Sequence, residues 1–122
     1  MKKGLFIILL AFAQQFYAQK ASPALSKSYS KIELQQIEEA GNGAIEVLNY
    51  AVDHACYVIP APEGKDVSQF PTIAVKSKKD LRFTDLHLQI KDRTQYFKIE
   101  GGNELLIVKS SNILKLEMQN QK

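Results

Sequence analysis

Asp53, His54 and Cys56 stand close together in the chain and include the residue types of a nucleophile–base pair. A cysteine thiol becomes a strong nucleophile when a neighbouring histidine accepts its proton. Residues two apart share a face on a strand but point in nearly opposite directions on a helix, and a helix is favoured for this stretch. No motif of a cysteine protease surrounds Cys56. We therefore predict no catalytic residue here, and a protein that is not an enzyme.

Potential metal ligands are few in this sequence. Zinc and copper sites use three or four His, Cys or carboxylate ligands at suitable spacing. The chain has two histidines, His54 and His87, and one cysteine, Cys56. Between Leu86 and Leu88 on a strand, His87 would face solvent. Since a Gly-rich phosphate loop and a nucleophile elbow are also missing from the sequence, we predict neither a metal site nor a cofactor.

A basic cluster is the clearest candidate for binding. Lys76, Lys78, Lys79 and Arg82 lie between two predicted strands, and Tyr96 lies on a neighbouring predicted strand. Cationic side chains beside aromatic rings bind anionic groups or sugars. Lysines also protect sheet edges from unwanted pairing, and that interpretation stays open. We take these five residues as the candidate binding site.

A second function class is a small-ligand carrier or a minor enzyme. It would need a pocket between the element at 44–59 and the concave side of a sheet. Asp53, His54 and Tyr57 would supply the polar groups of that pocket.

The first half of the mature chain is predicted to be helical. Ser30 and Glu33 fit a capping box, which begins a helix over 31–40 that Gly41-Asn42-Gly43 ends. Residues 44–59 fit a helix buried on most of its circumference, and their alternation also fits strands. Because the stretch is long, we favour the helix, ended by Pro60.

The second half is predicted to be a sheet. Five stretches separated by short turns are predicted to be strands: 72–76, 81–91 with a bulge at its centre, 94–100, 104–109 and 113–118. Apolar residues alternate in 81–91 and 113–118, whereas 104–109 is apolar through its middle. Short connections force antiparallel pairing, and the apolar stretch at 104–109 is expected to be central. The predicted fold class is α+β, with one or two N-terminal helices packed on one face of a four- to five-stranded antiparallel meander.

The N-terminus carries the pattern of a secretory signal. Lys2 and Lys3 precede an unbroken apolar run over 5–12, which is too short to span a bilayer, so we predict no stable transmembrane anchor. We place a signal peptide at 1–18 with cleavage after Ala18, a flexible leader at 19–30, and a single domain at 31–122. The protein is therefore expected to be exported, to a periplasm or the exterior, and to be bacterial.

Charge and composition limit the choice of partner. With 45% hydrophobic and 24% charged residues, the chain is an ordinary globular protein rather than a disordered one. Removal of Lys2 and Lys3 with the signal leaves 14 basic and 13 acidic residues, too balanced for a nucleic-acid-binding face. We predict a small non-enzymatic binding module, such as an envelope accessory or an inhibitor, whose partner is another protein of the envelope or exterior.

Overall fold

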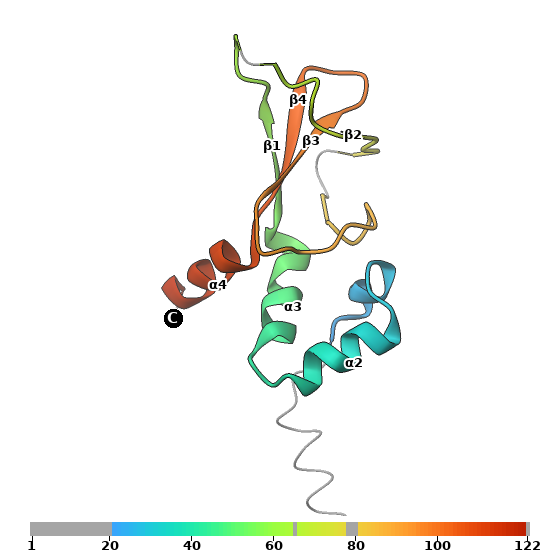
Figure 1. The fold of residues 1–122 in the computed structure, drawn as a ribbon, viewed down its shortest axis with the longest axis vertical. Coiled ribbons are helices and arrows are strands. Elements are labelled where there is room, and N and C mark those ends of the chain that lie inside the picture. The colour runs from blue at the N-terminus through green and yellow to red at the C-terminus, as the bar shows by residue number, and fades with distance from the viewer. Residues whose placement is uncertain (1–20, 65, 78–80, 122) are drawn as a thin grey trace, which may run out of the picture.

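The computed structural model describes residues 21–64, 66–77 and 81–121. The predicted signal peptide at 1–18 lies outside these residues. The elements, in chain order, are a 3-10 helix η1 (Pro23–Lys27), α2 (Lys31–Glu39), α3 (Ala44–His54), β1 (Cys56–Pro60), β2 (Thr72–Ile73), β3 (Gln95–Ile99), β4 (Glu104–Val108) and α4 (Ser111–Asn120). Figure 1 shows the strands at one end of the molecule and α2, α3 and α4 at the other.

The predicted helix at 31–40 is confirmed as α2. The Oγ atom of Ser30 accepts a hydrogen bond from the backbone amide of Glu33 at 3.0 Å. The Glu33 carboxylate in turn accepts one from the backbone amide of Ser30 at 2.8 Å. The capping box predicted from these two residues is therefore present. After α2 the chain turns at Gly41, whose φ of 64° is a conformation that glycine adopts at little cost.

The prediction of one helix over 44–59 is wrong beyond His54. Helix α3 ends at His54, and β1 begins at Cys56. Ala55 joins the two, because its amide donates to the carbonyl of Ala51 while its own carbonyl accepts from the amide of Lys109 at 2.9 Å. Beyond this point the chain is a strand because every residue of β1 pairs with a residue of β4, and Tyr57, Val58 and Ile59 are good strand formers.

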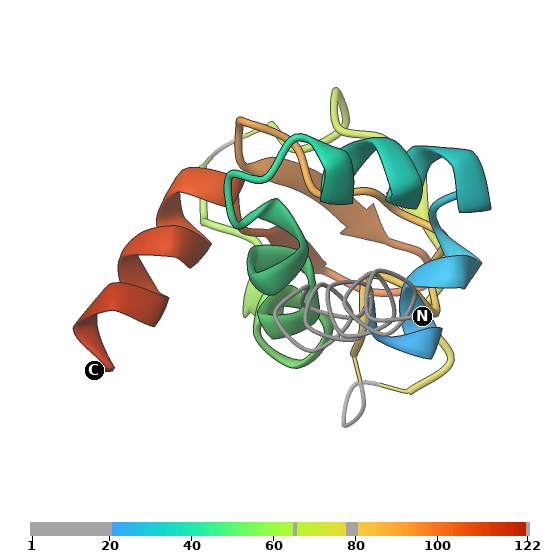
Figure 2. The same ribbon diagram turned by 90° about the horizontal axis from the view of Figure 1, so that it is seen from below.

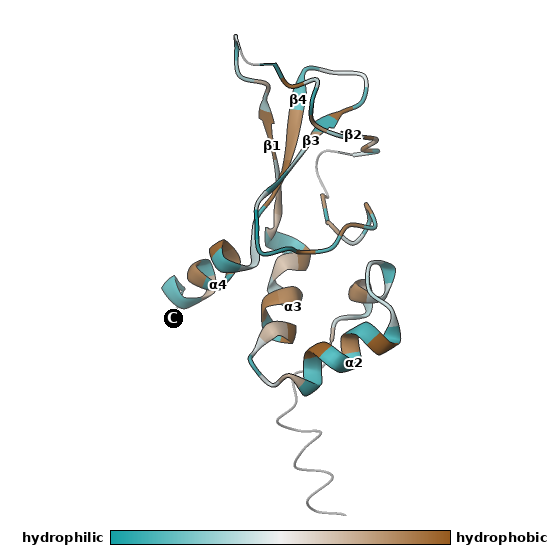
Figure 3. Cartoon of the chain, in the orientation of Figure 1, coloured by the Kyte–Doolittle hydropathy of each residue, from teal (hydrophilic) through white to brown (hydrophobic). Residues whose placement is uncertain are grey.

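The sheet is mixed, so the predicted pure meander is wrong. Its strand order is β1-β4-β3-β2, with β4 antiparallel to both β1 and β3, and β2 parallel to β3. The central place expected for the apolar stretch at 104–109 is confirmed, and Figure 3 shows the apolar character of β4. In β4, Leu105, Leu106, Ile107 and Val108 are all buried, as expected of a strand with neighbours on both sides.

Two predicted strands are absent from the described residues. Residues 81–91 form turns without ladder pairing, yet Phe83 is fully buried and Leu86 and Leu88 pack against the core. The alternation at 113–118 belongs to α4. Leu114 is fully buried there, whereas Leu116 is 59% exposed, which shows a helical rather than an alternating burial pattern. The side chain of Ser110 caps this helix by accepting from the amide of Ile113.

The core lies between the helices and one face of the sheet. Helix α3 contributes Leu48, Ala51 and Val52, the sheet contributes Ile99, Leu106 and Val108, and the rest of the buried cluster is Leu25, Tyr29, Ala55, Phe83 and Leu114. Helix α4 projects sideways from this body (Figure 2). None of the described helices is both long and apolar enough to cross a membrane.

Residues 21–30 differ from the flexible leader expected at 19–30. Leu25, in η1, is fully buried, and Tyr29 is 7% exposed. Polar contacts also hold this segment against the loop before β3: Lys27 Nζ to Asp85 Oδ1 at 2.7 Å, His87 Nδ1 to the Lys27 carbonyl at 3.0 Å, Gln89 Nε2 to the Ser28 carbonyl at 2.8 Å, and the Ile90 amide to the Tyr29 hydroxyl at 2.8 Å. We call these contacts the N-terminal clamp.

Candidate functional site

The face of the sheet turned away from the core carries a row of exposed tyrosines. In the strand register, Tyr57 of β1 and Tyr96 of β3 both lie directly opposite Ile107 of β4. Residues directly opposite one another in an antiparallel ladder place their side chains on the same face. Tyr57 is 42% exposed and Tyr96 is 43% exposed. We call this side of the sheet the outer face.

A second row of the outer face lies beside the first. Ile59 and Lys98 lie opposite Leu105 of β4. Leu105 and Ile107 are 4% and 5% exposed, although both lie outside the core cluster that contains the buried side chains of α3 and α4. The centre of the outer face is therefore buried, and the tyrosines on either side of it are exposed. The result is an apolar strip with a tyrosine on each side.

Each tyrosine has a neighbour that limits its movement. The ring of Phe70 stacks on Tyr96, with ring centroids 5.5 Å apart and an interplanar angle of 27°. Lys109 Nζ lies 5.7 Å from the ring centroid of Tyr57, within the range of a cation–π contact. Lys109 also pairs with Glu117 of α4 at 2.6 Å. Held aromatic side chains lose less entropy on binding, which suits a docking surface.

The residues of the predicted carrier pocket are not gathered around one cavity. His54 stacks on Tyr50, with ring centroids 4.2 Å apart, and Tyr57 lies on the outer face. Asp53 pairs with Arg82 at 3.0 Å, and both side chains are about half exposed. An apolar cleft does lie beside α3, but other residues of that helix line it, as described below.

The predicted basic cluster is partly neutralised where the structure describes it. Lys76 and Arg82 border a depression that also contains Asp85. Arg82 is paired with Asp53, and Asp85 is paired with Lys27. Lys78 and Lys79 lie outside the described residues. Tyr96, the aromatic member of the predicted site, has different surroundings, because it faces Ile107 and stacks on Phe70.

Cys56 lies in surroundings that disfavour reactivity. Its side chain packs against the core, and burial raises the pKa of the thiol to about 12. A nucleophilic cysteine needs the opposite, a pKa lowered by a cation or a histidine. Between His54 and Cys56 the described structure contains no hydrogen bond, and no cluster of three or more His, Cys, Asp or Glu suited to a metal is found among the residues it describes.

The carboxylate of Glu117 joins α4 to both the sheet and α3. The Tyr50 hydroxyl donates a hydrogen bond to it at 3.0 Å, in addition to the ion pair with Lys109. The hydrogen bond and positive charge of Lys109 lower the pKa of Glu117 from its usual value. The cation beside Tyr57 is therefore already engaged. Lys98 is the charged residue of the outer face within the described strands, and its positive charge helps to lower the pKa of Asp66.

The chain matches no protein-family model, no curated protein and no solved structure. The candidate site is therefore argued from the geometry of the structure alone.

Sequence reasoning named Tyr57 and Tyr96 but placed them in two separate sites. It missed Phe70, Ile59 and Ile107. A strand interpretation of 56–60 would have placed Tyr57 and Ile59 on one face, and the turns around 70 carry no comparable signal.

Proposed function

We propose that the protein is a small exported binding module that uses the outer face of its sheet to dock another protein. The observation that carries the proposal is the row Tyr57–Ile107–Tyr96, with a half-exposed tyrosine on each side of a buried isoleucine. Tyrosine is enriched at protein interfaces because it combines a large apolar ring with a polar edge. Docking would cover the two rings while their hydroxyl groups bond at the rim.

The charge of the outer face specifies the partner further. Lys98 is the only charged residue at an outer-face position of the described strands, and it lies in the row next to Tyr96. A complementary surface would present apolar side chains to the tyrosines and a carboxylate to Lys98. We therefore propose a protein partner with an apolar, acidic patch, located in the envelope or outside the cell.

The test is position-specific photocrosslinking in the cells that make the protein. A benzoylphenylalanine replaces Tyr57 or Tyr96, and a matched control carries it at Glu38, an exposed position of α2. We expect both tyrosine positions to yield the same crosslinked protein, and the Glu38 position to yield none of it. Unlabelled wild-type protein should compete for this product, whereas competition by Y96S should require about tenfold more protein, as expected of a hot-spot tyrosine.

Two results would overturn the proposal. One is the absence of a shared product from positions 57 and 96 in folded protein, judged by circular dichroism. The other is a product that Y96S and wild type compete for equally, because such a product does not depend on the aromatic row.

Export is tested separately, by mass spectrometry of the protein recovered from the periplasm or culture fluid. We expect a mature chain that begins at Gln19. An intact chain that keeps Met1 and stays in the cytoplasm would contradict the export part of the proposal.

A further inference from the structure

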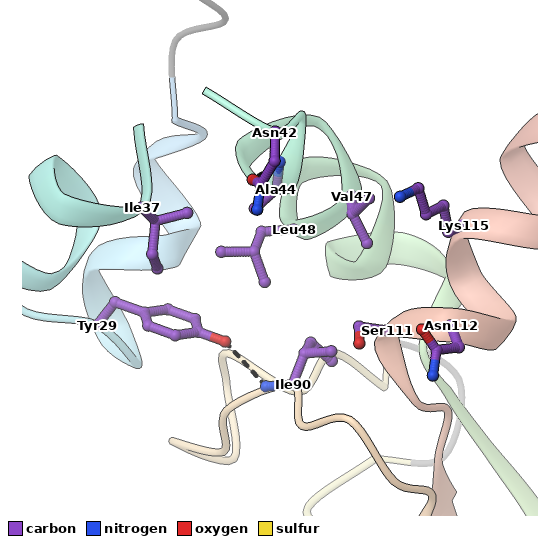
Figure 4. Close-up of a pocket in the computed structure, with 10 residues that line it drawn as sticks. All are labelled: Tyr29, Ile37, Asn42, Ala44, Val47, Leu48, Ile90, Ser111, Asn112 and Lys115. Atoms are coloured by element: carbon purple, nitrogen blue, oxygen red, sulfur yellow. Dashed lines mark hydrogen bonds between the residues drawn. The ribbon is translucent and has the colours of Figure 1, made fainter. Parts of the chain in front are cut away.

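An apolar cleft lies on the helical side of the molecule, away from the outer face. It has a volume of about 290 Å³. Figure 4 shows its lining, which comes from η1–α2, α3, the loop before β3 and the first turns of α4: Tyr29, Ile37, Asn42, Ala44, Val47, Leu48, Ile90, Ser111, Asn112 and Lys115.

The walls of the cleft are apolar and its polar groups lie at the margin. Ile37, Leu48 and Ile90 surround the space together with the ring of Tyr29 (Figure 4). The Tyr29 hydroxyl is already engaged, because it accepts a hydrogen bond from the amide of Ile90. A ligand within the cleft would therefore meet hydrocarbon and an aromatic ring, which favour an alkyl chain over a polar ligand.

One cation stands at the margin of the cleft. Lys115 extends from α4 on the side of the cleft formed by Val47 (Figure 4). Lys27 and Lys109, which directly follows β4, each pair with a carboxylate. Lys115 has no ion pair or hydrogen bond with the residues that the structure describes. An apolar space with one free ammonium group at its edge is complementary to a chain that ends in one negative charge.

We propose that this cleft binds a medium-chain carboxylate, with the alkyl chain between α2 and α3 and the carboxylate at Lys115. The volume equals that of about ten water molecules at about 30 Å³ each, which suits a short hydrocarbon chain rather than a full-length lipid. Helix α2 has no fully buried residue, and it contacts the core through the partly buried side chains of Leu34 and Ile37. This site is independent of the outer face, and it adds a small-molecule ligand to the proposed docking function.

The experiment is a titration of the protein with decanoate and, separately, with decanol, followed by methyl NMR. We expect both ligands to shift the methyl signals of Ile37, Leu48 and Ile90. In K115Q the affinity for decanoate should fall by up to about fivefold, the range of one solvent-exposed ion pair, while that for decanol stays the same. K31Q, which removes an exposed lysine at the start of α2, is the matched control and should bind both ligands as wild type does.

A blocking variant tests the location of the site. V47F places a ring where the cleft opens against α3. A44L adds an aliphatic side chain to the same wall and is used if V47F alters the amide spectrum of the free protein. Both should abolish the decanoate shifts. The proposal is overturned if decanoate leaves the three reporter residues unshifted, if the blocked variant binds as wild type does, or if K115Q and K31Q have equal affinity for decanoate.

Discussion

The hydroxyl of Tyr29 accepts a hydrogen bond from the backbone amide of Ile90 at 2.8 Å, and this bond joins residues 61 positions apart. Tyr29 is 7% exposed, so the amide would lose its partner in a place that water reaches poorly. We expect Y29F to lower the free energy of unfolding by about 1–3 kcal/mol. Urea denaturation measures this value. Y57F is the control, since the exposed Tyr57 hydroxyl has no hydrogen bond to the described residues; equal losses in the two variants would contradict the prediction.

The segment before α2 should contribute strongly to stability. Leu25 is fully buried against the core, so L25A should leave a cavity and cost about 2–5 kcal/mol. I32A, which shortens a side chain that is 68% exposed, should change stability by less than about 0.5 kcal/mol. Thermal and urea unfolding of both variants provide the comparison. A loss as small in L25A as in I32A would mean that 21–30 do not hold their place in solution.

Stability should fall in alkaline solution because of Cys56. Burial raises the pKa of its thiol to about 12, so the native state keeps a proton that the unfolded state loses above about pH 9. The contribution is fully present below that pH and is lost as the pH rises toward 12, by about 1.4 kcal/mol per pH unit. Burial also raises the pKa of Tyr29, which adds to the loss above about pH 10. Between pH 8 and 10 the free energy of unfolding should decrease more steeply in wild type than in C56A, and parallel curves would refute the assignment to Cys56.

Pro60 protects an open edge of the sheet. β1 is an edge strand, and Ala55 and Ala61 form its bonds toward β4, so by alternation Pro60 occupies a position whose amide would face outward. A proline there removes a donor that another strand could use. P60T should therefore increase self-association, measured by light scattering after size exclusion at matched concentrations. P62T is the control, because Pro62 lies outside β1, and its profile should equal that of the wild type. Equal profiles for P60T and P62T would argue against this role for Pro60.

The parts of the fold that were predicted correctly depend on short-range signals. The side chains of Ser30 and Glu33 each accept a hydrogen bond from the other residue's backbone amide within one helical turn. Gly101 and its neighbours form the turn between β3 and β4. The stretches at 81–91 and 113–118 have apolar alternation that long-range packing overrides. Phe83 reaches the core from a turn, and Leu114 does so from a helix, so apolar side chains were buried without the predicted pairing.

The sequence identified two residues of the candidate site but not their common location. Tyr57 and Tyr96 were named for different reasons, one as a pocket residue and one as the neighbour of a basic cluster. Their common row depends on the register of β1 and β3 against β4. It also depends on the pairing of β1 with β4, which lies more than forty residues later in the chain. Arg82 and Asp53 likewise belonged to separate predicted sites, and the fold pairs them with each other.

The N-terminal clamp also determines when this chain can finish folding. Its contacts join residues 58 to 61 positions apart, and β4, the centre of the sheet, follows them in the chain. During synthesis residues 21–30 must therefore wait for most of the chain before they reach their final place. Leu25 and Tyr29 stay exposed to other molecules during that interval. A factor that delays premature folding would find its target there, in side chains that the finished protein hides.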